Sequence, residues 1–123
     1  MLACVGPGHR LAGRARVRLR DLADDAWIAS ARDGLIVQAC RGAGFEPRVE
    51  YLTSDPLAIG SLVTAGHGVT LAPRLLAPHL TGVATPALVG TPVRRSIYTL
   101  TPTGRVHPLV PEFLDALRAE ARA

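Results

Sequence analysis

The sequence contains no lysine, few aromatic residues and only two cysteines, and these scarcities exclude several classes of protein. Cys4 and Cys40 are too few for a disulfide-stapled secreted domain, so we expect both thiols to be reduced. Aromatic residues make up 4% of the chain, which leaves no motif for stacking nucleic-acid bases. No apolar run reaches the roughly 18 residues needed to cross a bilayer, and the N-terminus lacks the pattern of a signal peptide. We therefore expect a cytoplasmic protein without membrane contacts.

The positive charge comes from arginine alone, and 14 basic residues against 10 acidic residues give a net charge of +4. Five arginines lie close together, at Arg10, Arg14, Arg16, Arg18 and Arg20. In the segment RARVRLR they alternate with apolar residues, which is typical of a solvated edge strand and equally suits a surface facing DNA. Because no recognition helix accompanies the charge, we favour the solvated strand.

The order of apolar segments predicts a single α/β domain, for which 123 residues suffice. Strands are predicted at residues 1–5, 26–30, 48–52, 69–72, 82–88 and 94–101. Helices are predicted at residues 33–43, from 56 to about 66, from 74 onward, and from about 108 to 121. This alternation favours a parallel or mixed sheet flanked by helices, with a parallel β-α-β-α-β core over residues 27–76. We expect the core to bury Trp27, Ile36, Leu62, Val63, Val69 and Leu71.

A pair of glycines, Gly66 and Gly68, encloses His67 in the segment TAGHGVTL. A phosphate-binding glycine loop leads from a strand into a helix, whereas this one leads from a helix into a strand. The helix end therefore carries partial negative charge and would repel an anion. We predict that Gly66 ends the helix in a left-handed conformation and that Gly68 eases the turn into the sheet. His67 is then either an exposed turn residue or a contact at the edge of a ligand cleft.

Two loops follow predicted strands and lead into predicted helices, which is where ligands bind in open parallel sheets. Their candidate binding residues are Ser30, Ala31 and Arg32 in the first loop and Thr53, Ser54 and Asp55 in the second. Both loops offer hydroxyl groups and free backbone N–H groups, and Arg32 adds a full positive charge, a combination that suits a carboxylate. The alternative is that these polar residues only cap the helices that follow them.

Catalytic and metal chemistry have little support in the residues. The two cysteines lie in apolar segments, and the four histidines show neither mutual helical spacing nor an adjacent cysteine. Carboxylate pairs such as Asp24 with Asp25 adjoin only in sequence. We expect no catalytic residue, no metal site and no cofactor.

The motifs together resemble the effector-binding domain of LysR-type transcriptional regulators over nearly the whole chain. The segments GPGHRLAGR, DLADDAWIAS, GFEPRVEYL and LVTAGHGVTLAPRLL resemble, in order and spacing, the loose family patterns P-x-x-H-P-L-A, D-L-x-x-x-x-W-I, an aromatic residue plus proline before a strand, and L-V-x-x-G-x-G-V-x-x-x-P. Arg10 departs from the pattern where the family usually has proline. His67 departs where an aliphatic or another polar residue is commoner.

The resemblance implies a type 2 periplasmic-binding-protein-like fold, in which a small effector binds between two α/β subdomains. Residues up to about 88 would form the second subdomain, and residues from about 89 to 123 the returning hinge strand and last helix of the first. We expect a truncated, ligand-sensing regulatory module without a DNA-binding domain, so that DNA is contacted only through an N-terminal helix-turn-helix absent from this chain. The effector would be small and anionic, held at the two loops with His67 and Gly68 nearby, and the chain would form a homo-oligomer. The alternatives are a fragment of a solute-binding protein of the same fold and, without positive support, an enzyme.

Overall fold

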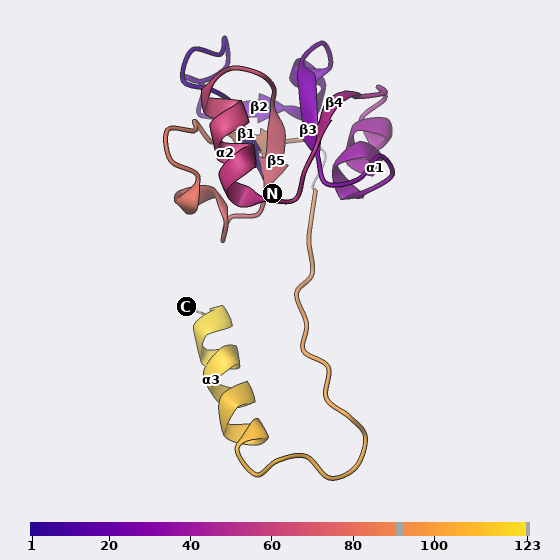
Figure 1. The fold of residues 1–123 in the computed structure, drawn as a ribbon, viewed down its shortest axis with the longest axis vertical. Coiled ribbons are helices and arrows are strands. Elements are labelled where there is room, and N and C mark those ends of the chain that lie inside the picture. Colours follow the sequence, from indigo (N-terminus) through magenta and orange to yellow (C-terminus); the bar gives the residue numbers. More distant parts are fainter. Residues whose placement is uncertain (91–92, 123) are drawn as a thin grey trace.

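A computed structural model of the chain describes residues 1–90 and 93–122. The strands are β1 (Leu2–Cys4), β2 (Arg16–Arg18), β3 (Ala26–Ala29), β4 (Arg48–Leu52), β5 (Thr70–Ala72) and β6 (Ala87–Val89). The helices are α1 (Leu35–Gly42), α2 (Pro56–Thr64) and α3 (Val110–Arg122), with short 3-10 turns η1 (Leu19–Leu22) and η2 (Ala77–His79). Figure 1 shows the strands gathered between α1 and α2, and the tail that carries α3 leaving this folded part.

The strands form a mixed arrangement, as the sequence predicted. Four strands pair in the order β2-β6-β1-β5, in which β1 runs antiparallel to both neighbours and β2 runs parallel to β6. The remaining pair, β3 and β4, is parallel. A single parallel bridge between Trp27 and Val69 joins β3 to β5. The expected parallel β-α-β-α-β unit is therefore present, although its link to β5 is short.

Local sequence signals account for the ends of both helices in the folded part. The Asp55 side chain caps α2 by accepting a hydrogen bond from the backbone N–H of Leu57 at 2.9 Å, and Pro56 occupies the first turn. The helix ends at Thr64, and Gly66 just beyond it has a φ of +79°, the left-handed conformation expected for it. After α1, Gly44 has a φ of +91° and stops that helix in the same way. The first helix begins two residues later than predicted, at Leu35 rather than at residue 33.

Alternating side chains bury both faces of the sheet. Ala3 and Val5 of the first strand segment pack with Val69 and Leu71 in the larger core cluster, while Cys4 packs with residues of η2 on the other face. The period of two is what a strand requires when both of its faces are covered. Of the six residues expected in the core, Trp27, Val63, Val69 and Leu71 are buried, whereas Ile36 and Leu62 are only half-buried.

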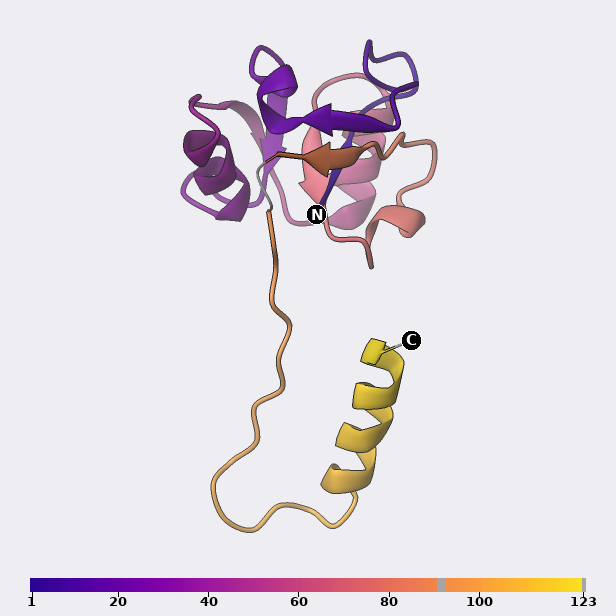
Figure 2. The same ribbon diagram turned by 180° about the vertical axis from the view of Figure 1, so that it is seen from behind.

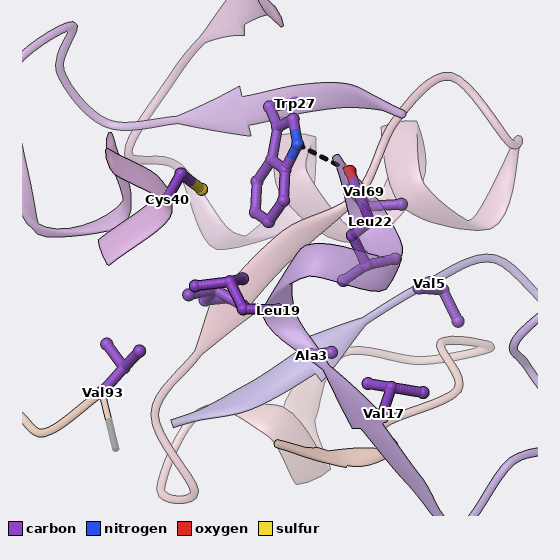
Figure 3. Packing of buried hydrophobic residues seen from close by; sticks show 10 residues of the cluster. Ala3, Val5, Val17, Leu19, Leu22, Trp27, Cys40, Val69 and Val93 are labelled. Carbon is purple, nitrogen blue, oxygen red and sulfur yellow. Dashed lines mark hydrogen bonds between the residues drawn. The ribbon is translucent and has the colours of Figure 1, made fainter. Parts of the chain in front are cut away.

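Trp27 belongs to the larger cluster, and its indole nitrogen donates a hydrogen bond to the carbonyl oxygen of Leu22 at 3.1 Å (Figure 3). This bond satisfies the one polar atom of a fully buried ring. It joins the start of β3 to the end of η1, and Asp21 closes the start of η1 by accepting a hydrogen bond from the Arg18 backbone N–H at 2.8 Å. The D-L-x-x-x-x-W-I pattern thus describes a turn whose two ends are tied by side chains.

The segment RARVRLR forms the solvated edge strand that its alternation predicts. In β2, Val17 is buried at 3% exposure while Arg16 and Arg18 on either side are exposed. The strand pairs with β6 on one side only. Charged residues on an exposed edge discourage pairing with other chains.

Two predicted elements are wrong. Residues 94–101 form no strand but an exposed extended segment, because a strand requires a hydrogen-bonding neighbour and this segment leads away from the sheet. The helix predicted from residue 74 is reduced to turns and the 3-10 turn η2, since Pro78 interrupts the pattern of helical hydrogen bonds. The strand predicted at 82–88 is shorter than expected and occupies Ala87–Val89.

The third helix stands apart from the folded part in both ribbon views (Figures 1 and 2). No residue of α3 between 110 and 122 is buried, and Phe113 on its apolar side is 64% exposed. Ile97 and Tyr98 on the connecting segment are exposed to a similar degree. An apolar surface of this kind in a folded chain is normally covered by a partner.

We predict that Gly6→Ala destabilises the fold by about 1–3 kcal/mol, because the added methyl overpacks a rigid site. A Cβ at Gly6 would lie 2.5 Å from the backbone carbonyl oxygen of Val63. The matched control is Gly8→Ala, since a Cβ there meets no atom within 4 Å. Urea denaturation should lower the unfolding midpoint for Gly6→Ala only, and an equal effect of the two substitutions would contradict this steric account.

We predict that the chain self-associates through the apolar side of its tail. Light scattering should give a mass above 13.0 kDa that rises with concentration. Hydrogen exchange should be fast in α3 in dilute samples and slow in β3, because the helix lacks packing that opposes local opening. The double substitution of Phe113 and Leu117 by serine should reduce the association. A monomer at every concentration, with a protected α3, would count against the prediction.

Candidate effector site

The two candidate loops meet at one edge of the sheet because the strands before them are parallel neighbours. Ala29 and Leu52, the last residues of β3 and β4, lie in register. Immediately beyond them, the Thr53 backbone N–H donates a hydrogen bond to the Ala29 carbonyl oxygen at 3.0 Å. Ser30 and Thr53 therefore emerge side by side at the carboxyl ends of the strands, as the sequence predicted for parallel neighbours.

A cavity of about 460 Å³ opens at this edge. Its polar lining residues are Ser30, Thr53, Ser54, Thr70 and Arg95. Its apolar lining residues are Met1, Ile28, Ala29, Leu35, Ile36, Ile59, Leu71, Pro73 and Leu76. The cavity thus combines an apolar floor with a small number of hydroxyl groups, which is the usual composition of a small-molecule site.

Thr70 is the one buried polar residue in the described part of the chain, and its hydroxyl proton is used in a hydrogen bond within the protein. Its hydroxyl donates a hydrogen bond to the Ile28 carbonyl oxygen at 2.8 Å, continuing the pairing of β3 with β5 beyond the Trp27–Val69 bridge. The lone pairs of that hydroxyl remain as acceptors. Thr70 therefore fixes the floor of the cavity, whereas Ser30, Thr53 and Ser54 supply the hydroxyls at its rim.

Asp55 serves the second loop as a helix cap and does not line the cavity. The Thr53 hydroxyl accepts a hydrogen bond from the Asp55 backbone N–H at 3.2 Å, which closes the loop just before α2. The capping role considered for these residues is thus present for Asp55. Thr53 both supports the loop and faces the cavity.

Ala31 and Arg32 also lie outside the cavity lining. Arg32 is exposed, and the Ala31 carbonyl oxygen accepts a long hydrogen bond of 3.5 Å from the Gly34 N–H in the turn before α1. The positively charged side chain on the lining is instead that of Arg95, in the segment where the sequence predicted a strand.

The structure does not bring His67 and Gly68 to the same cavity. They line a separate hollow of about 640 Å³, together with Ala26 at the amino end of β3 and Arg48 at the amino end of β4. A Cβ at Gly68 would lie 3.0 Å from the Ala26 carbonyl oxygen, so this glycine allows the close approach of two chain segments. His67 is an exposed turn residue whose ring lies 6.3 Å from that of Tyr51, and it also borders this second hollow.

A charged network that the sequence reasoning missed borders this second hollow. The His9 Nε2 and Asp25 Oδ1 atoms lie 3.0 Å apart, and Arg10 donates to Asp25 Oδ2 at 2.9 Å. Because His9 Nδ1 accepts a hydrogen bond from the Leu11 backbone N–H, Nε2 carries the proton shared with Asp25. The network ties the loop after β1 to the start of β3. In the sequence, the feature that pointed to this network was the histidine of the segment GPGHRLAGR.

Within the described residues there is no group of three or more His, Cys, Asp or Glu side chains placed to hold a metal ion. The same part of the chain has no helix long and apolar enough to cross a membrane.

Both cysteines are free and buried. Burial raises the pKa of the Cys4 thiol to about 11, and burial with the nearby negative charge of Glu46 raises that of Cys40 to about 12. Protonated, buried thiols of this kind are poor nucleophiles.

A mixed sheet with helices on both faces and a polar-rimmed cavity at the strand ends defines a ligand-binding α/β domain. The family model described as LysR substrate binding domain matches residues 1–122. The chain therefore belongs to the LysR substrate-binding domain family, which has a periplasmic-binding-protein-like fold.

Individual relatives agree with this assignment. The HTH-type transcriptional regulator ShiR of Corynebacterium glutamicum is 36% identical over 94 residues, which cover 71% of this chain and 30% of ShiR. The C-terminal domain of a probable LysR family regulator from Rhodococcus sp. RHA1 is 27% identical with a TM-score of 0.61, over 76% of this chain and 49% of that one. The effector-binding domain of QuiR in complex with shikimate has a TM-score of 0.72 at 20% identity, over 98% of this chain and 61% of that one. The chain spans about 25% to 30% of the length of the curated regulators it matches.

We predict that neither thiol reacts with a disulfide reagent in the native protein at pH 8, and that both react after unfolding in guanidinium chloride. The same pKa shifts predict the pH dependence of stability. As the pH rises above 9.0, the unfolded thiols lose protons that the folded thiols retain, so the free energy of unfolding should fall between about pH 9 and 11. Replacing Cys40 with alanine should reduce this alkaline loss of stability. Rapid labelling of the folded chain would contradict the prediction.

Proposed function

We propose that this chain is the ligand-sensing part of a LysR-type transcriptional regulator and that it binds a small anionic effector to control transcription. The observation that carries the proposal is the cavity at the carboxyl ends of β3 and β4, which combines hydroxyl groups of two loops with an apolar floor. The curated relatives that match are transcriptional regulators, which favours regulation over solute capture or catalysis.

The lining chemistry suits a carboxylate attached to a compact apolar body. Ser30 and Ser54 can donate hydrogen bonds to carboxylate oxygens, while Ile28, Leu35 and Leu71 cover hydrocarbon. QuiR, which has the same fold, is solved in complex with shikimate, a ring compound that bears a carboxylate. We therefore propose a ring carboxylate or a similar small acid as the effector, bound at Ser30, Thr53 and Ser54.

We propose that residues up to about 88 form one lobe of a two-lobed domain and that residues from about 89 belong to the other. The exposure of Phe113 and of the segment before α3 supports this division, because those apolar surfaces lack a neighbour among the described residues. A cleft closed by two lobes buries most of a small ligand. With one lobe only, about half of those contacts remain, so the affinity of this chain should be millimolar. DNA would be contacted by a helix-turn-helix outside this chain.

Nuclear magnetic resonance titration of the amide-labelled chain tests the proposed site. The probes are shikimate, benzoate and succinate, each added up to about 20 mM because millimolar binding is expected. Amide signals of Ser30, Thr53 and Ser54 should move and saturate, whereas those of His67 and Gly68 should stay in place. Movement confined to the hollow that contains His67, or no movement with any probe, would overturn the proposal.

A pair of serine substitutions provides the matched control. Ser30→Ala should weaken carboxylate binding about threefold to tenfold, the loss expected for one hydrogen bond. Ser61→Ala should leave it unchanged, because the Ser61 hydroxyl donates to the Leu57 carbonyl oxygen on α2 and lies outside the cavity lining. If the two substitutions changed the affinity equally, the proposal that the Ser30 hydroxyl binds the carboxylate would be wrong.

A further inference from the structure

Among the described residues that line the cavity, Arg95 is the only one with a charged side chain, and the N-terminal ammonium group of Met1 is bound to the Val93 carbonyl oxygen. No carboxylate lines the cavity, and the two nearby acids, Asp33 and Asp55, lie outside the lining. The electrostatic field at the mouth is therefore positive, and Arg74 and Arg94 line an adjoining hollow that shares Met1, Pro73 and Arg95 with the cavity. A mouth of this charge admits an anion in preference to a neutral or cationic molecule.

The position of Arg95 is set by the core and not by the exposed tail that follows. Val93 belongs to the main core cluster and is only 8% exposed (Figure 3). The backbone nitrogen of Met1 donates a hydrogen bond to the Val93 carbonyl oxygen at 3.1 Å, and Met1 itself lines the cavity. Because alternate residues of an extended segment point to the same side, Arg95 follows Val93 towards the domain. Beyond it the chain turns outward, and Ile97 is 69% exposed.

The guanidinium group of Arg95 is available to a ligand. The four arginine–carboxylate ion pairs among the described residues involve Arg10, Arg41, Arg48 and Arg118, the fifth close contact joins His9 to Asp25, and none involves Arg95. Arginine presents its N–H groups in a planar fork that matches the two oxygens of a carboxylate. The hydroxyls of Ser30 and Ser54, which line the same cavity, can complete the hydrogen bonding of the same carboxylate.

We propose that Arg95 selects the charge of the effector by forming an ion pair with its carboxylate at the mouth of the cavity. The proposal rests on the effector-binding function argued above and assigns the selecting charge to Arg95 instead of Arg32, which lies outside the lining. It also has a structural consequence. Arg95 begins the segment that leads to α3, so the bound carboxylate joins this segment to the loops after β3 and β4.

The test compares charged and uncharged forms of one molecule. Dissociation constants of shikimate and methyl shikimate, and of benzoate and benzamide, are measured by the same resonance titration on the 123-residue chain. The wild type should favour each acid over its neutral form by about tenfold, the ratio typical of one charge-assisted hydrogen bond. Arg95→Gln should abolish this preference and leave the affinity for the neutral form within twofold.

Two further arginine substitutions serve as controls. Arg94→Gln removes the neighbouring charge, which does not line the cavity, and Arg32→Gln removes the charge of the first loop. Both should keep the preference for the acid. The proposal is overturned if Arg95→Gln keeps the preference while the acids bind at the cavity, or if Arg32→Gln or Arg94→Gln removes it equally.

The failure of the effector-binding function itself would look different. In that case neither the acids nor their neutral forms would move the amide signals of Ser30 and Thr53 in the wild type. Folding of Arg95→Gln is checked by its unfolding midpoint in urea, which should match that of the wild type because the side chain is exposed. Signals of the arginine guanidinium groups give an independent readout, since that of Arg95 should shift with acid and not with its neutral counterpart.

Discussion

The backbone bridge between Trp27 and Val69 is the contact on which the rest of the structure depends. It joins the two-stranded sheet of β3 and β4 to the four-stranded sheet, through hydrogen bonds of 2.9 Å from Ile28 to Val69 and 2.8 Å from Val69 to Ala26. Thr70 extends the same connection with its side chain. Because the pairing is short, it depends on close approach of the two segments, which Gly68 permits by having no Cβ. The bridge, the Thr70 hydrogen bond and the packing of Trp27 in the larger core cluster together fix the relative position of the two sheets and of the cavity at their ends.

The same bridge explains why the core and the site are adjacent. The indole of Trp27 is held from η1 by Leu22, so β3 is fixed at its beginning by a side chain and along its length by two neighbouring strands. Its end, at Ala29, is therefore well placed to present Ser30. A loop that must bind a ligand is best positioned when the strand before it is rigid. The rim residues Ser30 and Thr53 directly follow β3 and β4, so these two strands fix their positions.

The chain also contains surfaces that its own fold does not use. The apolar side of α3 and the segment before it are exposed, while Val93 at the base of that segment is buried in the core. The transition from buried to exposed occurs within a few residues of Arg95. The candidate effector site thus lies where the folded part ends and the tail begins.

Much of the fold followed from local chemistry that can be read in the sequence. Asp55 before Pro56 indicated the start of α2, and Gly66 its end, because capping and left-handed turns depend on a few neighbouring residues. The alternation around Val17 predicted an exposed edge strand, and the apolar runs predicted parallel neighbours whose loops would meet. These inferences need only the periodicity of side chains along one segment.

Other features were decided by tertiary structure alone. Residues 94–101 have strand-like composition but no partner edge, and a strand does not exist without its neighbour's hydrogen bonds. The cavity lining includes Arg95 and omits Arg32, although Arg32 is next to Ala31 in the predicted loop. His67 and Gly68 face the amino ends of the strands, away from Ser30. Each of these outcomes depends on which distant segments come together in space, and that information is contained in packing and pairing and not in the pattern of any single segment.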